Sequence, residues 1–263
     1  MNLVYHNPGV DYMIDSILMF QSDNITEFWS DSLYSFYPQI DKKKAKQLNF
    51  EDRKKYIEKI IREIYGNLEN ELNQKIEVYN KYWHENKNQI EEALSEAFEI
   101  DCSALFNEMK CNISLNPVSP RFLKENSFEV FYLNSEKGAL GISIHEIIHF
   151  IWFYVWNSLF DDDYDEYEQP SLKWILSEMV VESIMRDSRL SSINPYFSRE
   201  HGGCIYPYFF DMKVDNKLVL NSLDEMYRKY NIKDFMKYSY QFCLQNDETI
   251  REHIAKSERI KGE

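Results

Sequence analysis

The sequence is short of glycine, of basic residues relative to acidic ones, and of long apolar runs. Only seven of its 263 residues are glycine, so few positions favour the backbone conformations that tight turns need. That scarcity argues against a turn-rich all-β fold and favours long helices. Lys and Arg number 30 against 44 Asp and Glu, a formal net charge of −14. A chain this acidic is unsuited to nucleic-acid phosphates, so we expect no nucleic-acid partner.

Cysteine is also scarce, and the four residues Cys102, Cys111, Cys204 and Cys243 are scattered along the chain. None of them forms a Cys-x-x-Cys spacing, so we expect reduced thiols in the core. The first residues lack the basic head and apolar run of a secretory signal. These absences together predict a cytoplasmic protein.

The apolar stretch from Ala139 to Trp156 is the one segment that suggests a membrane span. It is interrupted by His145, Glu146 and His149, and intramembrane metalloproteases do carry such residues within spanning helices. No second apolar segment exists to pack against it, and the acidic residues 161–163 follow it without anchoring Lys or Arg. We therefore expect no membrane partner.

The residues that are present support a sizeable core. Hydrophobic residues make up 44% of the chain and aromatic residues 16%, which suits one large domain or two tightly joined subdomains. In the first 100 residues apolar side chains recur at intervals of three and four, for example at Ile57, Ile60, Ile61 and Ile64. This spacing predicts long amphipathic helices, one of which starts near Asn49.

Beyond residue 100 the pattern changes to that of strands. Residues 111–115 and 127–134 read as strands, and Pro117 and Pro120 between them indicate turns. We expect these segments to form a small antiparallel sheet. Residues 135–138 then lead into a helix that continues to about residue 157.

A His-Glu-x-x-His motif lies in this helix, with His145, Glu146 and His149 among apolar neighbours. At about 100° per residue, the two imidazoles lie on one helix face and can reach the same metal ion. Glu146 lies on the adjoining flank, where it can take a proton from a water in the metal's open position. By chance the pattern is expected about 0.01 times in such a chain. The alternative is a pair of ordinary hydrogen-bonded core histidines.

A second apolar helix is predicted from Leu172 to about Asp187, with Ser171 as its N-cap. It is apolar on nearly every side, yet Glu178 and Glu182 lie one turn apart on one face. A buried carboxylate needs a cation, a hydrogen bond or a metal. The alternatives to a metal role are an exposed polar stripe and a pair of buried salt bridges.

The segments on either side of this helix are irregular. Residues 160–168 are acidic but fit no calcium-loop template, so we interpret them as a solvated connection. Residues 194–208 are rich in tyrosine, and loops of this kind often line sites. Ser222 and Glu225 form a capping box that predicts the start of the C-terminal helices.

The motif and the acidic helix after it resemble the gluzincin metallopeptidases, the group that includes thermolysin and the aminopeptidase N type. The resemblance covers the two helices and at most the strand before them, about a quarter of the chain. In that family a Glu on the second helix is the third zinc ligand, and residues 174–178 are similar to the stretch that carries it. The resemblance thus implies Glu178 as a ligand and Glu182 as the acid that holds a ligand histidine from behind.

Some features of that family and of its relatives are missing. The 28 residues between His149 and Glu178 exceed the family's usual interval, and the acidic segment is the insertion. No Gly-x-Met-Glu-Asn motif precedes the zinc motif, so exopeptidase specificity is unsupported. The metzincin family needs Gly and His where this chain has Trp152 and Val155, and it is excluded.

The resemblance implies an α+β, predominantly helical fold with a zincin-like catalytic core. We expect an N-terminal helical region at residues 1–100, the core at 101–215, and C-terminal helices at 216–263. In such a fold the strand at 127–134 could hold an extended peptide by pairing along its edge, as the corresponding strand does in the family.

The implied function is that of a zinc-dependent metallopeptidase acting on a peptide or protein substrate. Zn²⁺ would lower the pKa of a bound water, and Glu146 would accept the proton. The zinc ligands implied are His145, His149 and Glu178. The oxyanion needs a hydrogen-bond donor, and the candidates by position and type are His201, Tyr206 and Tyr208.

Two other classes of function stay open. One is a zinc-stabilised binding or regulatory module without turnover, against which Glu146 argues because a structural site has no need of a base. The other is a metal-dependent hydrolase of a non-peptide amide, which the sequence does not separate from a peptidase. The sequence gives no indication of oligomeric state.

Overall fold

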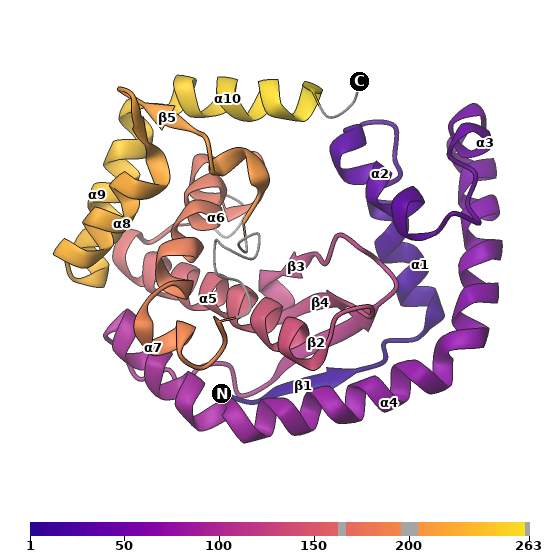
Figure 1. Ribbon diagram of the computed structural model, residues 1–263, viewed down its shortest axis with the longest axis horizontal. Helices are drawn as coiled ribbons and strands as arrows, with labels where there is room; N and C mark the ends of the chain where they lie inside the picture. The colour runs from indigo at the N-terminus through magenta and orange to yellow at the C-terminus, as the bar shows by residue number, and fades with distance from the viewer. Residues whose placement is uncertain (163–166, 196–204, 261–263) are drawn as a thin grey trace.

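The chain folds into a predominantly helical structure with a four-stranded mixed sheet and a two-stranded hairpin (Figure 1). This computed structural model describes residues 1–162, 167–195 and 205–260. Helices account for most of the described chain. The expected class, α+β and predominantly helical, is therefore confirmed.

The N-terminal third contains a strand as well as the expected helices. β1 (Leu3–His6) comes first, followed by α1 (Val10–Met19), α2 (Glu27–Phe36), α3 (Lys42–Gln47) and α4 (Phe50–Phe98). The expectation of helices missed β1 because a four-residue strand carries too little alternation to be recognised. Since β1 pairs with a strand from beyond residue 100, this third of the chain contributes to the central sheet.

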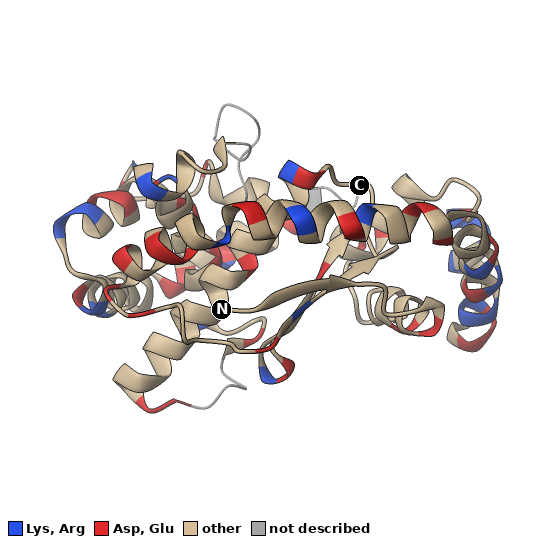
Figure 2. Cartoon of the chain, turned by 90° about the horizontal axis from the view of Figure 1, so that it is seen from below, with Lys and Arg blue, Asp and Glu red and all other residues tan. Residues whose placement is uncertain are grey.

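The long helix α4, of 49 residues, curves around the outside of the molecule (Figure 1). The side chain of Asn49 accepts a hydrogen bond from the backbone N–H of Asp52, which confirms the predicted start. Its buried residues include Ile57, Ile61 and Leu72, whereas residues of both charges lie along its outer side (Figure 2). This is the amphipathic pattern expected of a surface helix.

The sheet is mixed, and most of its pairing is parallel. Its strands lie in the order β1, β2 (Met109–Ser114), β4 (Ser127–Phe131) and β3 (Arg121–Phe122). β1 pairs parallel with β2, and β2 with β4, while β3 pairs antiparallel with β4. The predicted antiparallel sheet is therefore wrong. The connection between β2 and β4 is long and includes β3, so it returns the chain to the same end of the sheet, as parallel pairing requires.

Strand β4 lies inside the sheet, between β2 and β3. β3 pairs with it at Ser127 and Phe128, and the Glu129 N–H donates to Pro120 O, so the first part of the predicted strand at 127–134 is not the free edge that was expected. The edge beside β4 is β3, which is followed by the short helical turn η1 (Leu123–Glu125). β3 has only two residues and follows a proline, so it shows no alternation of apolar and polar residues. The sequence therefore could not indicate that β3 is the edge strand.

The register of the strands determines which side chains share a face. Tyr5, Cys111, Phe128 and Arg121 are successive partners across the four strands, so their side chains lie on one face. The Tyr5 hydroxyl lies 2.8 Å from Ser143 Oγ, and Ser143 belongs to the motif helix. Arg121 therefore projects from the edge strand toward that helix.

The motif helix α5 (Glu136–Phe160) and the acidic helix α6 (Leu172–Met185) pack together in the core. The Ser171 side chain accepts a hydrogen bond from Trp174 N–H, which confirms the predicted cap. Every residue of α6 is buried, as is most of α5. Of the helices described, α5 is the one long and apolar enough to cross a membrane, and 89% of that stretch is buried inside the structure.

Seven further elements follow α6 in the part of the chain that the structure describes. They are α7 (Ser188–Ser191), η5 (Pro207–Phe209), β5 (Lys213–Val214), β6 (Lys217–Leu218), α8 (Val219–Lys229), α9 (Ile232–Gln245) and α10 (Asp247–Ile260). The predicted capping box at Ser222 and Glu225 is wrong, because β6 runs directly into α8 and both residues lie inside that helix. Glu225 instead forms an ion pair with Lys217 at 2.6 Å.

Candidate metal centre

Three donor residues converge between α5 and α6. The Nε2 atoms of His145 and His149 lie 3.0 Å apart. Glu178 reaches them from α6, with Oε1 at 3.6 Å from His149 Nε2 and Oε2 at 3.9 Å from His145 Nε2. The side chains of His145, His149 and Glu178 are 13%, 1% and 5% exposed. The structure therefore brings together the three residues predicted as ligands.

The chemistry of this donor set fits a transition metal. With bonds of about 2.0–2.1 Å, neighbouring ligand atoms of a tetrahedral zinc site lie about 3.3 Å apart, which falls within the separations found here. Burial, and then the charge of Arg121, lower the pKa of His145 to about 3 and hold the pKa of His149 well below its usual value. Both imidazoles are therefore neutral near pH 7 and offer lone pairs to a cation.

The position of Glu182 differs from the one that the resemblance implies. Glu182 is buried on α6, and its Oε1 lies 4.0 Å from Arg186 Nε. The buried Nδ1 atom of His149 has no hydrogen-bond partner among the described residues. Among the described residues, no hydrogen bond or ion pair joins Glu182 to His145 or His149, and the ion pair found for Glu182 there is the one to Arg186.

Glu146 lies next to the three donors. Its Oε1 is 3.9 Å from His145 Nε2, and its Oε2 accepts a hydrogen bond of 3.0 Å from Arg121 Nη1. Burial raises the pKa of Glu146 to about 7, the Glu178 carboxylate adds to the rise, and Arg121 opposes it. A carboxylate with a pKa near neutrality is suited to accept a proton at physiological pH.

Arg121 is the residue of this site that the sequence analysis did not single out. Besides the bond to Glu146, its Nη2 donates to Glu178 Oε1 at 3.2 Å, and its side chain is only 10% exposed. It therefore links the motif helix to the acidic helix from the edge strand. A general rule could have pointed to it, because two buried carboxylates require a nearby cation. Arg121 and Lys124 are the basic residues between the two predicted strands, and so they were the candidates for that cation.

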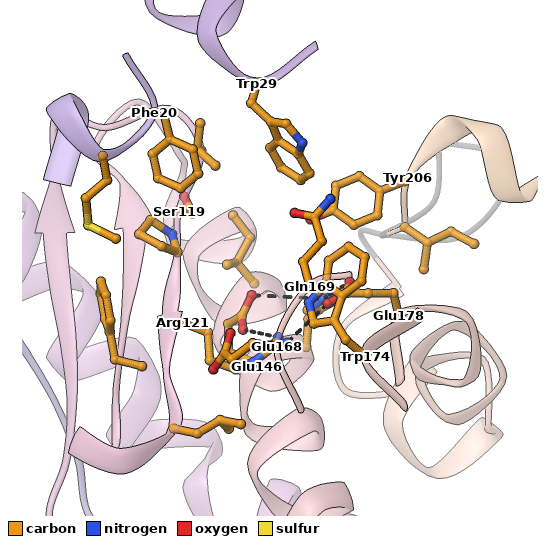
Figure 3. Close-up of a pocket in the computed structure, with 18 of the residues that line it drawn as sticks. Phe20, Trp29, Ser119, Arg121, Glu146, Glu168, Gln169, Trp174, Glu178 and Tyr206 are labelled. Atoms are coloured by element: carbon orange, nitrogen blue, oxygen red, sulfur yellow. Dashed lines mark hydrogen bonds and ion pairs between the residues drawn. The ribbon is translucent and has the colours of Figure 1, made fainter. Parts of the chain in front are cut away.

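A pocket of about 670 Å³ opens over these residues (Figure 3). The neutral imidazole of His145 lies in its wall, and the charged residues of the wall are Arg121, Lys124, Glu125, Glu146, Glu168 and Glu178. The rest of the wall is largely apolar and aromatic, and includes Phe20, Trp29, Phe122, Trp174 and Tyr206. Met19, Phe20 and Trp29 belong to this wall, so the N-terminal helices supply part of it.

The three candidate oxyanion donors have different positions. Tyr206 lines the pocket, with its ring centroid 5.2 Å from Trp29 and 6.0 Å from Trp174. Burial, and then the Glu178 carboxylate, raise the pKa of Tyr206 well above its usual value, so its hydroxyl keeps its proton. Tyr208 stacks on Tyr206 at 5.4 Å but is not part of the pocket wall. His201 lies outside the described residues.

Comparison of the chain with known protein families, curated proteins and solved structures finds no match. The resemblance to the gluzincins therefore depends on the motif, the acidic helix and the arrangement of their side chains. Those residues, and not a likeness over the whole chain, carry the functional argument.

Proposed function

We propose that the protein is a zinc-dependent metallopeptidase of the gluzincin type. The observation that carries the proposal is the convergence of His145, His149 and Glu178 beside Glu146, where His145, Glu146 and Glu178 line an open pocket. A zinc ion held by these three residues supplies a Lewis acid that acidifies water and polarises a carbonyl. A purely structural site has no need of a pocket or of a carboxylate beside its ligands.

Glu146 is the proposed general base. Its Oε2 is engaged by Arg121, while Oε1 is the oxygen turned toward the ligand His145. Oε1 therefore accepts the proton from the attacking water, and the same atom can return it to the leaving amine.

Tyr206 is the proposed donor to the oxyanion. Its ring lies in the pocket wall next to Trp174, and in Figure 3 Trp29 and Tyr206 lie above the charged residues. A protonated phenol in the pocket wall can donate a hydrogen bond to charge that develops on the substrate oxygen. His201 remains a second candidate on sequence grounds alone.

The proposed substrate is an extended peptide segment. β3 is an edge strand and contributes Arg121 and Phe122 to the pocket wall. A peptide that pairs with its backbone would lie across the donor cluster. The apolar and aromatic wall favours substrates that place hydrophobic side chains in the pocket.

The proposal is tested by incubating the protein with a mixed peptide library and identifying products by mass spectrometry. We expect internal cleavage by zinc-loaded protein and none after chelator treatment, with activity restored by added zinc. Cleavage that is unaffected by chelation contradicts the proposal. A library of non-peptide amides run in parallel separates a peptidase from an amidase of other substrates.

A further inference from the structure

Arg121 contacts both acidic residues of the site through separate nitrogen atoms. Nη1 donates to Glu146 Oε2 at 3.0 Å and Nη2 to Glu178 Oε1 at 3.2 Å. The two carboxylates come from different helices, and the side chains of Arg121, Glu146 and Glu178 are 10%, 9% and 5% exposed. A guanidinium can form such a fork because its donors are planar and fixed. The ion pairs are therefore well shielded from solvent.

One carboxylate oxygen faces both the guanidinium and the predicted metal position. Glu178 Oε1 lies 3.2 Å from Arg121 Nη2 and 3.6 Å from His149 Nε2. The imidazoles are neutral, so the two carboxylates and the guanidinium together carry a net charge of −1 when all three are ionised. A divalent metal would change this to +1. The guanidinium and the metal thus repel each other, and both are attracted to the carboxylate of Glu178.

We propose that Arg121 is the internal counter-ion of the metal-free site and competes with the metal for Glu178. The inference rests on the proposed function, because it takes His145, His149 and Glu178 as the metal ligands. In it Arg121 is a positioning residue. It keeps the two buried carboxylates paired when no metal is present, and it weakens metal binding when metal is available.

Two measurable properties follow from this competition. Removing the guanidinium leaves two buried carboxylates without a counter-ion, which destabilises the metal-free protein. The same change removes a positive charge from beside the metal, which strengthens metal binding. A different role, in which Arg121 only orients Glu178 for the metal, predicts weaker zinc binding on removal. The sign of the affinity change therefore distinguishes the two roles.

The experiment compares Arg121→Met and Arg121→Lys with the wild-type protein. Zinc affinity is measured by competition with a chromophoric chelator, and melting temperature with and without saturating zinc. Arg53→Met is the matched control, because Arg53 is also little exposed (13%) and paired, with Asp23, but lies outside the pocket wall. We expect this control to lower stability without changing zinc affinity.

For Arg121→Met we expect the metal-free melting temperature to fall by at least about 5 °C and the zinc dissociation constant to fall by at least about tenfold. Saturating zinc is expected to restore most of the lost stability. Arg121→Lys keeps the charge, so its zinc affinity is expected to stay within about threefold of wild type. An Arg121→Met protein that folds only when zinc is added also supports the proposal.

Unchanged or weaker zinc binding by Arg121→Met overturns the proposal, as does a variant that stays unfolded at saturating zinc. Arg121→Lys that binds zinc as tightly as Arg121→Met overturns it too, since charge is then not the cause. A wild-type protein that binds no zinc is a different result, because it removes the proposed function itself. The two failures are thus distinguishable.

Discussion

Two buried carboxylates on opposite sides of the sheet, Glu129 and Glu178, have different surroundings. Glu129 of β4 is buried near Tyr12 and Ser16 of α1, and no cation acts on it within the described chain. The groups that lower its pKa are hydroxyls, those of Ser16, Ser114 and Tyr12. Glu178 lies on the other side, where it meets Arg121 and two neutral imidazoles. One carboxylate thus has only neutral neighbours, while the other has a cation and two metal-ligating groups.

The difference shows that burial alone does not identify a metal site. Burial raises the pKa of Glu129 to about 7, and it also raises the pKa of Glu178. A raised carboxyl pKa is therefore common to both places. Only beside Glu178 do two imidazole nitrogens, those of His145 and His149, lie close enough to bind the same ion. That donor set is what a zinc site requires.

The largest expected effect is on zinc binding when each carboxylate is neutralised in turn. Glu178→Gln removes a proposed ligand, and we expect zinc affinity to fall by more than about 100-fold. Loss of a residue that only hydrogen-bonds a ligand typically costs less than this. Glu129→Gln is the matched control and is expected to leave zinc affinity unchanged. Zinc titration of both variants decides this. Equal affinities would remove the distinction between the two carboxylates.

Glu146→Gln sharpens the comparison within the site itself. We expect peptide hydrolysis to fall by about 10²- to 10⁴-fold, because the proton acceptor is lost, while zinc content stays that of the wild type. Parallel measurement of cleavage rate and bound zinc separates the two effects. If zinc is lost together with activity, Glu146 is a ligand or a structural partner and not the base.

Glu129 is expected to make stability depend on pH. Its pKa of about 7 in the folded protein exceeds the unfolded value of about 4.3, so the folded state binds the proton more tightly. Its stabilising contribution is present below the unfolded pKa and is lost as pH rises to about 7.

Glu129→Gln removes this dependence. Relative to wild type, we expect the variant to gain about 2–3 kcal/mol between pH 4.5 and pH 8. Urea unfolding at several pH values measures this gain. A difference that does not change with pH would show that Glu129 is ionised without penalty in the folded protein.

The smallest effect is expected for Glu182→Gln. The family resemblance implies a role in holding a ligand histidine, for which a loss of about 10- to 100-fold in zinc affinity is typical. Since Glu182 lies beside Arg186 and His149 Nδ1 has no partner in the described chain, we expect a change below about tenfold. A zinc titration that shows a larger loss restores the role implied by the resemblance.

Local patterns predicted the helices that carry the site, and long-range contacts determined the rest. The His145 to His149 spacing, the Ser171 cap and the apolar run of α6 are local, so the two helices could be located from the sequence. Arg121 could not be assigned, because its contacts to Glu146 and Glu178 span 25 and 57 residues. The parallel pairing of β2 with β4 also depends on how the connection between them crosses the sheet.

The most direct test of the account is the metal content and coordination of the purified protein. After purification without chelator and reloading with zinc, elemental analysis is expected to give one zinc per chain. X-ray absorption at the zinc edge is expected to show two imidazole nitrogens and a carboxylate oxygen, with Glu178→Gln losing that signal. No bound transition metal, or zinc retained in full by a His145→Ala, His149→Ala double variant, would contradict the proposed centre.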